Sequence, residues 1–458
     1  MKVIVCGAGQ VGANIARHLA TENNHVTVID QSPELIRRIG DTLDVRAIVG
    51  FASLPSVLEK AGAEDADMII AVTFADEVNM VACQVAHSIF HVPSKIARIR
   101  NQDYLQPIWA DLFSRDNMPI DHIISPEIEV ARAISHRLQT PGAFDMIPLA
   151  DGKVRAIGVR TDPDCPLLDT PLRQLTTLFP DLHIVVVGII RDGTTIVPTG
   201  DDQILAGDEV YFVSESAHVA RAMASFGHEE AEARRVVVVG AGNVGLFLAR
   251  EIEQSHPGVT ARLIENNRAR AEIAAAALTR TVVVNGNALD IEILSEANIA
   301  AAETIVTVTN DDKINILSAL LAKRAGCARS IALVNDLAFE PLITTLGVDV
   351  VVNPRAITAS TILQHVRRGR IRSVHALREG VGEVVEAEAL ETSSVIGTPL
   401  RDVDLDKGII IGAVIRDGEV LLPRGDTVIQ VNDLVVLFAA SRAVKKVEKM
   451  FAVRLEYF

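Results

Sequence analysis

The strongest constraint on the fold of this chain is an internal duplication. The motif Gly7-Ala8-Gly9-Gln10-Val11-Gly12 returns as Gly240-Ala241-Gly242-Asn243-Val244-Gly245. Further pairs follow in the same order: Gly50 with Gly286, Thr73 with Thr309, Asp76 with Asp312, Asn79 with Asn315 and Pro126 with Pro354. Because the order is kept and the offset changes only slightly, we expect two tandem copies of one structural plan.

Each copy begins with a strand, a glycine-rich turn, a helix and a second strand. In the first copy we place the first strand at Lys2–Cys6, the helix at Val11–Leu19 and the second strand at Val26–Asp30. In the second copy the same three elements are expected at Arg235–Val239, Val244–Ile252 and Ala261–Glu265. Further Val/Ile blocks occur at Val45–Val49, Met68–Thr73 and Ile96–Arg100. Short apolar strands that alternate with helices are typical of a parallel sheet covered on both faces. The pattern predicts an α/β chain with two Rossmann-like, doubly wound parallel sheets.

A connecting helix and a smaller module follow each sheet. Ser125-Pro126 and Asn353-Pro354 place a capping side chain before a proline at the first helical position. Asp192-Gly193 and Asp417-Gly418 separate apolar runs, which indicates β-hairpins in small α+β domains. The predicted segments are 1–123 and 232–350 for the Rossmann domains, 124–142 and 351–367 for the linker helices, and 143–227 and 368–453 for the small domains.

The composition excludes several kinds of partner and site. Lys and Arg number 44 against 59 Asp and Glu, and the net charge of −15 would repel a nucleic-acid backbone. The four cysteines include no CxxC pair, so we expect neither a disulfide framework nor a cysteine zinc cluster. Apolar runs such as Ile184–Ile190 are far shorter than the ~20 residues of a spanning helix. Met1-Lys2 leads directly into Val3–Val5, which predicts no secretory leader and a cytoplasmic location.

Two GxGxxG motifs at matching positions predict two sites for the diphosphate of a nucleotide. The first glycine permits a tight turn, the second lets the backbone approach the pyrophosphate, and the third lets the helix pack against the strand. The first helical turn then offers unpaired N–H groups and the positive end of its dipole to the phosphates. The predicted contacts are all six residues of each motif.

An acidic residue ends the second strand of each copy. Asp30 and Glu265 stand where a carboxylate accepts hydrogen bonds from ribose hydroxyls, and a negative charge there disfavours a 2′-phosphate. This favours NAD, or a plain adenine nucleotide, over NADP. Arg268 follows Glu265 closely and weakens that preference in the second copy. The alternative is that both acids are ordinary strand-end residues.

The ends of the fourth and fifth strands complete the predicted crevice. Thr73-Phe74 and Thr309-Asn310 end the fourth strands, on the side where ligands bind in such folds. Arg98 lies within the apolar fifth strand, and a buried cation needs an anionic partner, either a phosphate or an internal salt bridge. The second copy has Leu333 instead, so we expect the two sites to differ in phosphate affinity.

A possible metal stripe does not recur in the second copy. Cys83, His87 and His91 fall at i, i+4 and i+8 on a predicted helix, which would line up three ligands. The second copy has Ala319, Lys323 and Cys327 there. We favour a structural role for the three residues, assign no metal, and leave metal binding by the stripe open.

An NAD-dependent oxidoreductase is the alternative function that GxGxxG allows. A dehydrogenase needs a proton donor beside the nicotinamide, and no His, Lys or Tyr recurs at a suitable position in both small modules. A redox-sensing repressor would need a basic helix-turn-helix segment, for which the acidic chain gives no sign. We therefore favour a ligand-gated binding protein over an enzyme and assign no catalytic residue.

Taken together, these motifs resemble the TrkA family of bacterial Trk potassium uptake systems, in which RCK (regulator of potassium conductance) domains occur in tandem. The resemblance rests on GAGQVG with Asp30, Thr73 and Arg98, the Ser-Pro and Asn-Pro helix starts, the RDG hairpins with PTGD and PRGD, and the duplication itself. It covers nearly the whole chain.

The resemblance implies a cytoplasmic subunit, peripheral on the inner membrane, that binds NAD(H) and in some members ATP or ADP. It also implies a ring, a homotetramer, that gates a potassium-conducting membrane subunit of the TrkH or TrkG type. By similarity, Gly7 to Val11, Asp30, Thr73, Phe74 and Arg98 form the first nucleotide site. Gly240 to Val244, Glu265, Thr309 and Asn310 form the second, in which Leu333 departs from the first-copy pattern.

Overall fold

The computed structural model describes residues 1–451 apart from 22–23, 180–181, 230–232, 337–338, 340–342, 344, 367–370, 378–380 and 441. The predicted boundaries at 232, 367, 368 and 453 lie outside the described residues. The chain divides into two units. Unit 1 is Met1–Ala131, Leu333–Leu337 and Val352–Val366, and unit 2 is Arg132–Ala332, Ala338–Val351 and Arg367–Phe458.

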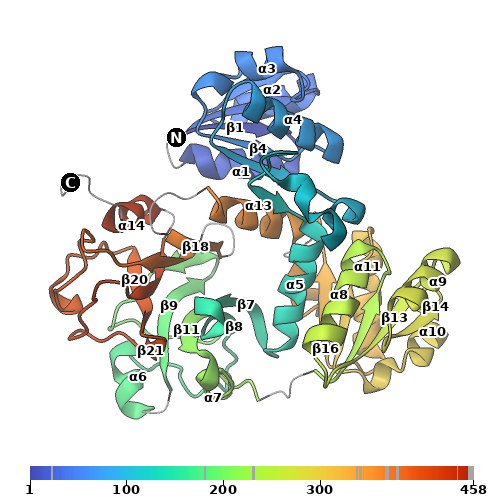
Figure 1. Cartoon of the computed structure of the whole chain (residues 1–458). Helices are drawn as coiled ribbons and strands as arrows, with labels where there is room; N and C mark the ends of the chain where they lie inside the picture. Colours follow the sequence, from blue (N-terminus) through green and yellow to red (C-terminus); the bar gives the residue numbers. More distant parts are fainter. Residues whose placement is uncertain are drawn as a thin grey trace. The chain divides into compact units, whose positions relative to one another are not determined.

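The first copy builds a six-stranded parallel sheet in the order β3-β2-β1-β4-β5-β6 (Figure 1). Its strands are β1 (Lys2–Cys6), β2 (His25–Asp30), β3 (Arg46–Val49), β4 (Met68–Ala71), β5 (Ser94–Arg98) and β6 (His122–Ile124). The order reverses beside β1, whose Val5 lies opposite Val28 on one side and Ile70 on the other. Ligands of doubly wound sheets bind at this reversal, outside the carboxyl ends of the strands.

Helices cover both faces of this sheet. They are α1 (Gln10–Thr21), α2 (Pro33–Thr42), α3 (Pro55–Lys60) and α4 (Asp76–Ser88). Successive residues of β1 alternate between two apolar cores: Val3 and Val5 pack with Leu19 of α1, whereas Ile4 and Cys6 pack with Leu58 of α3. Burial on both faces explains why the strand is continuously apolar.

The second copy repeats this sheet in the order β14-β13-β12-β15-β16-β17. Its strands are β12 (Arg235–Val239), β13 (Thr260–Glu265), β14 (Val282–Asn285), β15 (Thr304–Thr307), β16 (Arg329–Leu333) and β17 (Val350–Val352). Its helices include α8 (Asn243–Ser255), α9 (Arg268–Ala277), α10 (Ile291–Glu296) and α11 (Asp312–Arg324). The two predicted doubly wound sheets are therefore confirmed.

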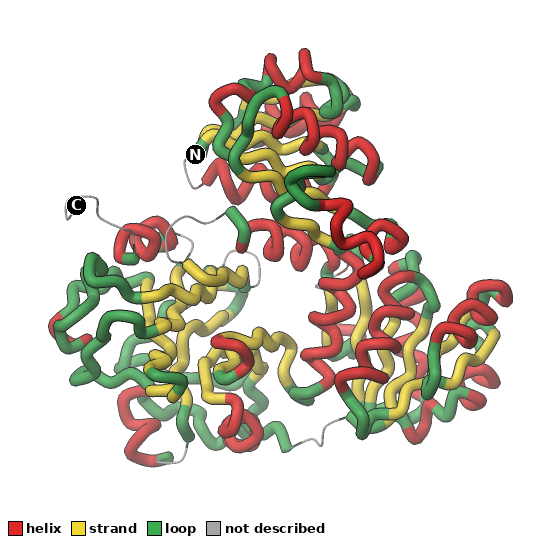
Figure 2. The backbone as a smooth tube through the Cα atoms, viewed as in Figure 1, coloured by secondary structure: helices red, strands yellow, loops and turns green. Residues whose placement is uncertain are grey.

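Two five-stranded sheets form the small domains, in the orders β10-β9-β11-β8-β7 and β18-β19-β22-β20-β21. Figure 2 draws the strands of both sheets in yellow. Their strands are β7 (Ala143–Leu149), β8 (Val154–Arg160), β9 (Ile184–Arg191), β10 (Thr194–Ile196), β11 (Glu209–Glu215), β18 (Ile371–Ala376), β19 (Glu383–Glu388), β20 (Ile409–Arg416), β21 (Glu419–Leu421) and β22 (Leu434–Ala439). Short helices accompany them: α6 (Leu172–Leu178), α7 (Val219–Ser225) and α14 (Val444–Met450). The predicted hairpins are present, and φ is positive at Asp192 (50°), Gly193 (74°), Asp417 (51°) and Gly418 (85°), as a type I′ turn requires.

The linker helices α5 (Pro126–Leu138) and α13 (Pro354–Gln364) are exchanged between the copies. In unit 1, Ile362 and Leu363 of α13 share a core with Ile15 and Leu19 of α1. In unit 2, Ser135 of α5 hydrogen-bonds His256, just after α8, at 2.8 Å. Each copy thus supplies the helix that packs beside the glycine-turn helix of the other.

A stacked histidine pair at the end of α13 makes unit 1 sensitive to acid. The rings of His122 and His365 lie 4.0 Å apart, and burial, together with the charge of His122, lowers the pKa of His365 to about 4. Between the ordinary pKa near 6.5 and this value the folded chain binds fewer protons than the unfolded chain, so stability is lost as the pH falls. We expect the melting temperature, followed by circular dichroism, to drop from about pH 7 to about pH 5, and to drop less in His365→Gln. An equal drop in both proteins would contradict this assignment.

Candidate nucleotide-binding sites

The first glycine of each motif makes the chain turn sharply after the first strand of its sheet. Gly7 and Gly240 have φ of +113° and +103°, a region that L side chains rarely adopt. Their N–H groups donate to the carbonyl oxygens of Ile29 and Ile264 at 2.7 and 2.8 Å. The turn is therefore held against the end of the neighbouring strand, β2 or β13.

The third glycine lets the helix approach that turn. A Cβ built on Gly12 would lie 1.9 Å from the carbonyl oxygen of Gly7, and one on Gly245 would lie 1.8 Å from that of Gly240. Both contacts are with backbone, which cannot swing away as a side chain can. No residue larger than glycine fits at either position.

The second glycine, by contrast, faces open space. A Cβ on Gly9 or Gly242 would meet no atom within 4 Å. The helices α1 and α8 begin at the next residue, so their first N–H groups, which have no intrahelical acceptor, lie beside this space. The arrangement suits a phosphate group, and a larger residue at either glycine would intrude into it.

The two predicted acids brace the glycine turns. Asp30 accepts hydrogen bonds from the N–H groups of Ala8 (2.6 Å) and Ser32 (2.8 Å), one on each carboxylate oxygen. Glu265 accepts from Ala241 (2.7 Å) and Asn267 (2.8 Å) in the same way. A carboxylate has about four acceptor positions, so each acid keeps capacity for ribose hydroxyls. Both acids therefore have a structural role in holding the glycine turn, and their contact with ribose stays a prediction.

Buried asparagines, to which the sequence analysis gave no role, hold the loop after the fourth strand. Asn79 of α4 accepts from the N–H (2.8 Å) and the hydroxyl (2.7 Å) of Thr73, and Asn315 of α11 accepts from Thr309 at the same distances. Both amides are fully buried. The recurrence of asparagine at matching positions of the two copies was the sequence signal that could have indicated this role. The predicted strand Met68–Thr73 is two residues too long, because the chain leaves β4 after Ala71 to reach this amide.

Arg98 is the last residue of β5 rather than an interior one, since the strand runs over Ser94–Arg98 and not Ile96–Arg100. Its Nη2 donates to the carbonyl oxygen of Thr73 at 2.9 Å, whereas its buried Nε has no partner. Burial, and next the charge of Arg100, lowers the pKa of Arg98. Among the described residues Arg98 makes no ion pair, so the salt-bridge alternative is not observed and an acceptor from a ligand remains suitable.

Phe74 and Arg100 contact each other just beyond the carboxyl ends of β4 and β5. Phe74 is 83% exposed, and the guanidinium of Arg100 lies 5.4 Å from the centre of its ring. The sequence analysis did not single out Arg100. In the second copy, the exposed Asn310 stands where Phe74 stands in the first.

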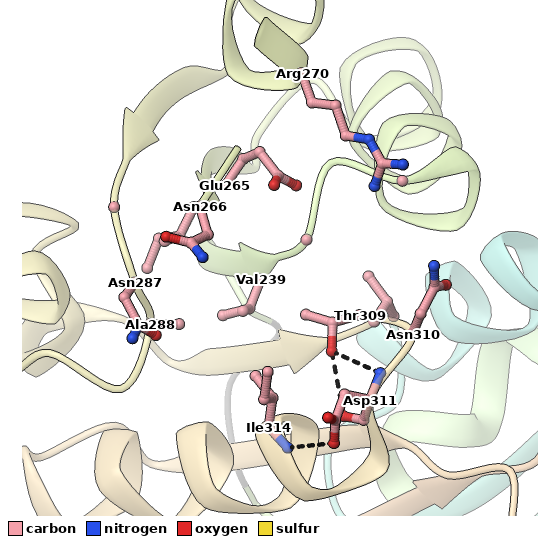
Figure 3. Close-up of a pocket in the computed structure, with 15 residues that line it drawn as sticks. Val239, Glu265, Asn266, Arg270, Asn287, Ala288, Thr309, Asn310, Asp311 and Ile314 are labelled. Carbon is pink, nitrogen blue, oxygen red and sulfur yellow. Dashed lines mark hydrogen bonds between the residues drawn. The ribbon is translucent and has the colours of Figure 1, made fainter. Parts of the chain in front are cut away.

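A pocket at the carboxyl edge of the second sheet brings the predicted residues together (Figure 3). Gly240, Gly242, Glu265, Thr309 and Asn310 all line it, while Ala241, Asn243, Val244 and Gly245 do not. The other polar residues in its lining, which the sequence analysis had not assigned, are Asn266, Arg270, Asn287 and Asp311. The glycine turn, the acid and the threonine loop thus meet around one space.

The proposed metal stripe is not formed. Helix α4 ends at Ser88, so His91 lies beyond it, with φ of 54°, and the i, i+4, i+8 register is wrong. Burial raises the pKa of Cys83 to about 12, which keeps it a thiol. Across the part of the chain that the structure describes, no three His, Cys, Asp or Glu side chains are grouped to hold a metal ion. In the same residues no helix is long and apolar enough to cross a bilayer.

The chain has two Rossmann-type sheets in tandem, each with a glycine turn and each followed by a small antiparallel sheet. This architecture defines the class of proteins with duplicated Rossmann-type domains. The TrkA-N domain family matches residues 3–126 and 236–354, and the TrkA-C domain family matches residues 157–227 and 384–452. The Trk system potassium uptake protein TrkA of Azorhizobium caulinodans is 53% identical over 100% of both chains, and that of Halomonas elongata is 40% identical over 100% of both. The chain belongs to the TrkA family of Trk system potassium uptake proteins.

Solved structures agree on the fold. The RCK domain of GsuK has a TM-score of 0.60 at 18% identity, covering 99% of this chain and 95% of that one. The GsuK channel bound to NAD has a TM-score of 0.59 at 18% identity, covering 99% of this chain and 79% of that one. At this identity the likeness concerns the RCK architecture alone.

Proposed function

We propose that this chain is a nucleotide-sensing regulatory subunit that gates the potassium-conducting membrane subunit of a Trk system, of the TrkH or TrkG type. The proposal rests on two matched arrangements, one in each copy, which we call the first and second cradle. In each cradle the second glycine of the motif faces open space at a helix N-terminus, and a carboxylate that is hydrogen-bonded to the turn stands where we expect the ribose. Two cradles of this kind fit NAD(H) or an adenine nucleotide.

The pocket of the second copy favours sensing over catalysis. None of the residues described in its lining is His, Lys, Tyr or Cys, the side chains that most often transfer a proton beside a nicotinamide. This supports a binding role over the alternative, an NAD-dependent oxidoreductase. The sites would then act only through different affinities for two conformations of the protein.

The exchanged linker helices offer a route from the first cradle to the rest of the chain. In unit 1, α13 packs against α1, whose N-terminus lies at the phosphate position. A ligand that shifts α1 therefore acts directly on a helix that belongs in sequence to the second copy. We propose this contact as the element that nucleotide binding biases.

We also propose a homotetrameric ring on the cytoplasmic face of the inner membrane. Val81 of α4 and Leu317 of α11 are exposed by 43% and 50% at matching positions of the two copies. Exposed apolar residues that recur in this way support association with further copies of the chain.

Potassium flux in proteoliposomes tests the function. The membrane subunit of the same system is reconstituted with and without this chain, and NADH, NAD, ATP or ADP is added. We expect flux to respond to nucleotide only when the chain is present. Flux that ignores every nucleotide would refute the sensing role, and rapid NADH turnover with a panel of hydroxy acids would instead support the oxidoreductase.

A further inference from the structure

The two crevices carry their positive charge on opposite sides of the glycine turn. In the first, the cation is Arg98 at the end of β5, and the equivalent residue of β16 is Leu333. In the second, the cation is Arg270 on the first turn of α9, and the equivalent residue of α2 is Leu35. Leu35 and Arg270 occupy the same position in their helices, because each donates its N–H group to the capping side chain three residues earlier. The capping residue is Ser32 in α2 and Asn267 in α9.

Arg270 and Glu265 line the pocket of the second copy (Figure 3). Gly242 lines the same pocket. In the part of the chain that the structure describes, the guanidinium of Arg270 has no hydrogen-bond or ion-pair partner. Its neighbour Arg268 is instead paired with Glu272, at 3.1 Å. Arg270 is thus an exposed cation in the pocket wall that makes no ion pair among the described residues, although the carboxylates of Glu265 and Asp311 line the same pocket.

The charge on Arg270 is unfavourable for the helix that carries it. The first turn of α9 contains no acidic residue, whereas that of α2 contains Glu34. A cation in the first turn opposes the helix dipole and destabilises the helix unless an anion lies nearby. Glu265, which accepts from the N–H group of the capping residue Asn267, places a carboxylate at this helix start, but it is already engaged in bracing the turn. A cation in this part of a pocket wall is suited to an anionic ligand.

We propose that Arg270 binds the phosphate chain of an adenine nucleotide in the second crevice and makes that crevice prefer nucleotides with two or more phosphates. This inference rests on the proposed nucleotide sensing. Glu265 occupies the ribose-diol position and would repel a 2′-phosphate. The open space at Gly242 accommodates the phosphate chain, and a guanidinium at its edge donates charged hydrogen bonds to the phosphate oxygens. The first crevice has Leu35 at this position and therefore lacks this source of preference for nucleotides with two or more phosphates.

The test uses isothermal titration calorimetry on the full chain with the first site disabled by Gly9→Asp. The test variant is Arg270→Leu, because leucine is the residue that the first copy has at the equivalent position, Leu35. We expect Arg270→Leu to weaken ADP and ATP binding about tenfold, and AMP binding less. Arg268→Leu removes a similar charge outside the pocket lining and should leave all three affinities unchanged. Leu35→Arg, in a chain with Gly242→Asp, should strengthen ADP binding to the first site.

Each other outcome overturns the inference in a different way. Equal affinities for ADP with and without Arg270 would refute the phosphate contact while leaving nucleotide sensing intact. Binding of NADP over NAD that depends on Arg270 would assign the guanidinium to a 2′-phosphate instead. Absence of any nucleotide binding in the parent Gly9→Asp chain would refute the second site and this inference with it. Nucleotide binding at the first site is measured separately in the chain with Gly242→Asp, and its absence there as well would refute nucleotide sensing.

Discussion

Gly12→Ala is expected to unfold the first glycine turn, at a cost of about 3 kcal/mol or more in the free energy of unfolding. The added Cβ would sit 1.9 Å from the carbonyl oxygen of Gly7, a distance that real Cβ atoms do not reach. Relief requires α1 to move away from β1, which breaks the packing of Leu19 with Val3 and Val5. Chemical denaturation followed by circular dichroism measures the loss.

Gly9→Ala is the matched control for this prediction. It adds the same methyl group three residues away, where no atom lies within 4 Å, so its free energy of unfolding should stay close to that of the parent. Gly245→Ala should repeat the effect in the second copy, where the distance to the oxygen of Gly240 is 1.8 Å. A Gly12→Ala protein as stable as Gly9→Ala would show that the turn is not packed as described.

Gly9→Asp is expected to abolish nucleotide binding at the first site while the protein stays folded. The open space at Gly9 accepts the side chain without a clash, but the carboxylate then occupies the position proposed for the phosphates. Like charges in contact cost several kcal/mol, which corresponds to a loss of affinity of about a hundredfold or more. Calorimetry with NADH and ADP measures this loss, and the melting temperature reports the fold.

Gly258→Asp provides the matched charge control for nucleotide binding. Gly258 also faces open space, but it lies in the exposed loop before β13, whose first residue pairs with Arg235 at the start of β12, whereas the second glycine turn follows the end of β12. This variant carries the same added charge and should bind nucleotide as the parent does. Unchanged affinity at the first site in Gly9→Asp would refute the placement of the phosphates and, with it, the first cradle.

Local backbone requirements made much of the fold predictable. Asp192-Gly193 and Asp417-Gly418 predicted hairpins because a type I′ turn needs two residues that tolerate positive φ. The glycine spacing predicted the turns because each glycine meets a separate requirement of backbone angle or close approach. Strand ends were less predictable: the apolar run through Val72 suggested a longer β4, but the hydrogen bonds of Thr73 to Asn79 end the strand early.

The candidate sites were only partly predictable for a related reason. Asp30 and Glu265 could be predicted as ribose contacts from their place at the end of the second strand, and that contact stays a prediction. Their hydrogen bonds to Ala8 and Ala241 became visible only once both segments were positioned. Asn79 and Arg270 are polar residues on helices, and nothing in their immediate sequence indicates that Asn79 is buried or that Arg270 lines a pocket. Their roles depend on which loop or pocket faces them.

The sequence by itself determined that this chain is a duplicated α/β protein with two glycine turns, because duplication, hydrophobic period and glycine spacing are properties of neighbouring residues. Only the tertiary structure decided that α13 packs on α1, and that Arg270, which makes no ion pair with any described residue, lines the pocket of the second copy. An apolar helix face fits many other apolar faces, so the sequence does not specify which copy it covers. That choice is made when distant segments meet and bury their surfaces together.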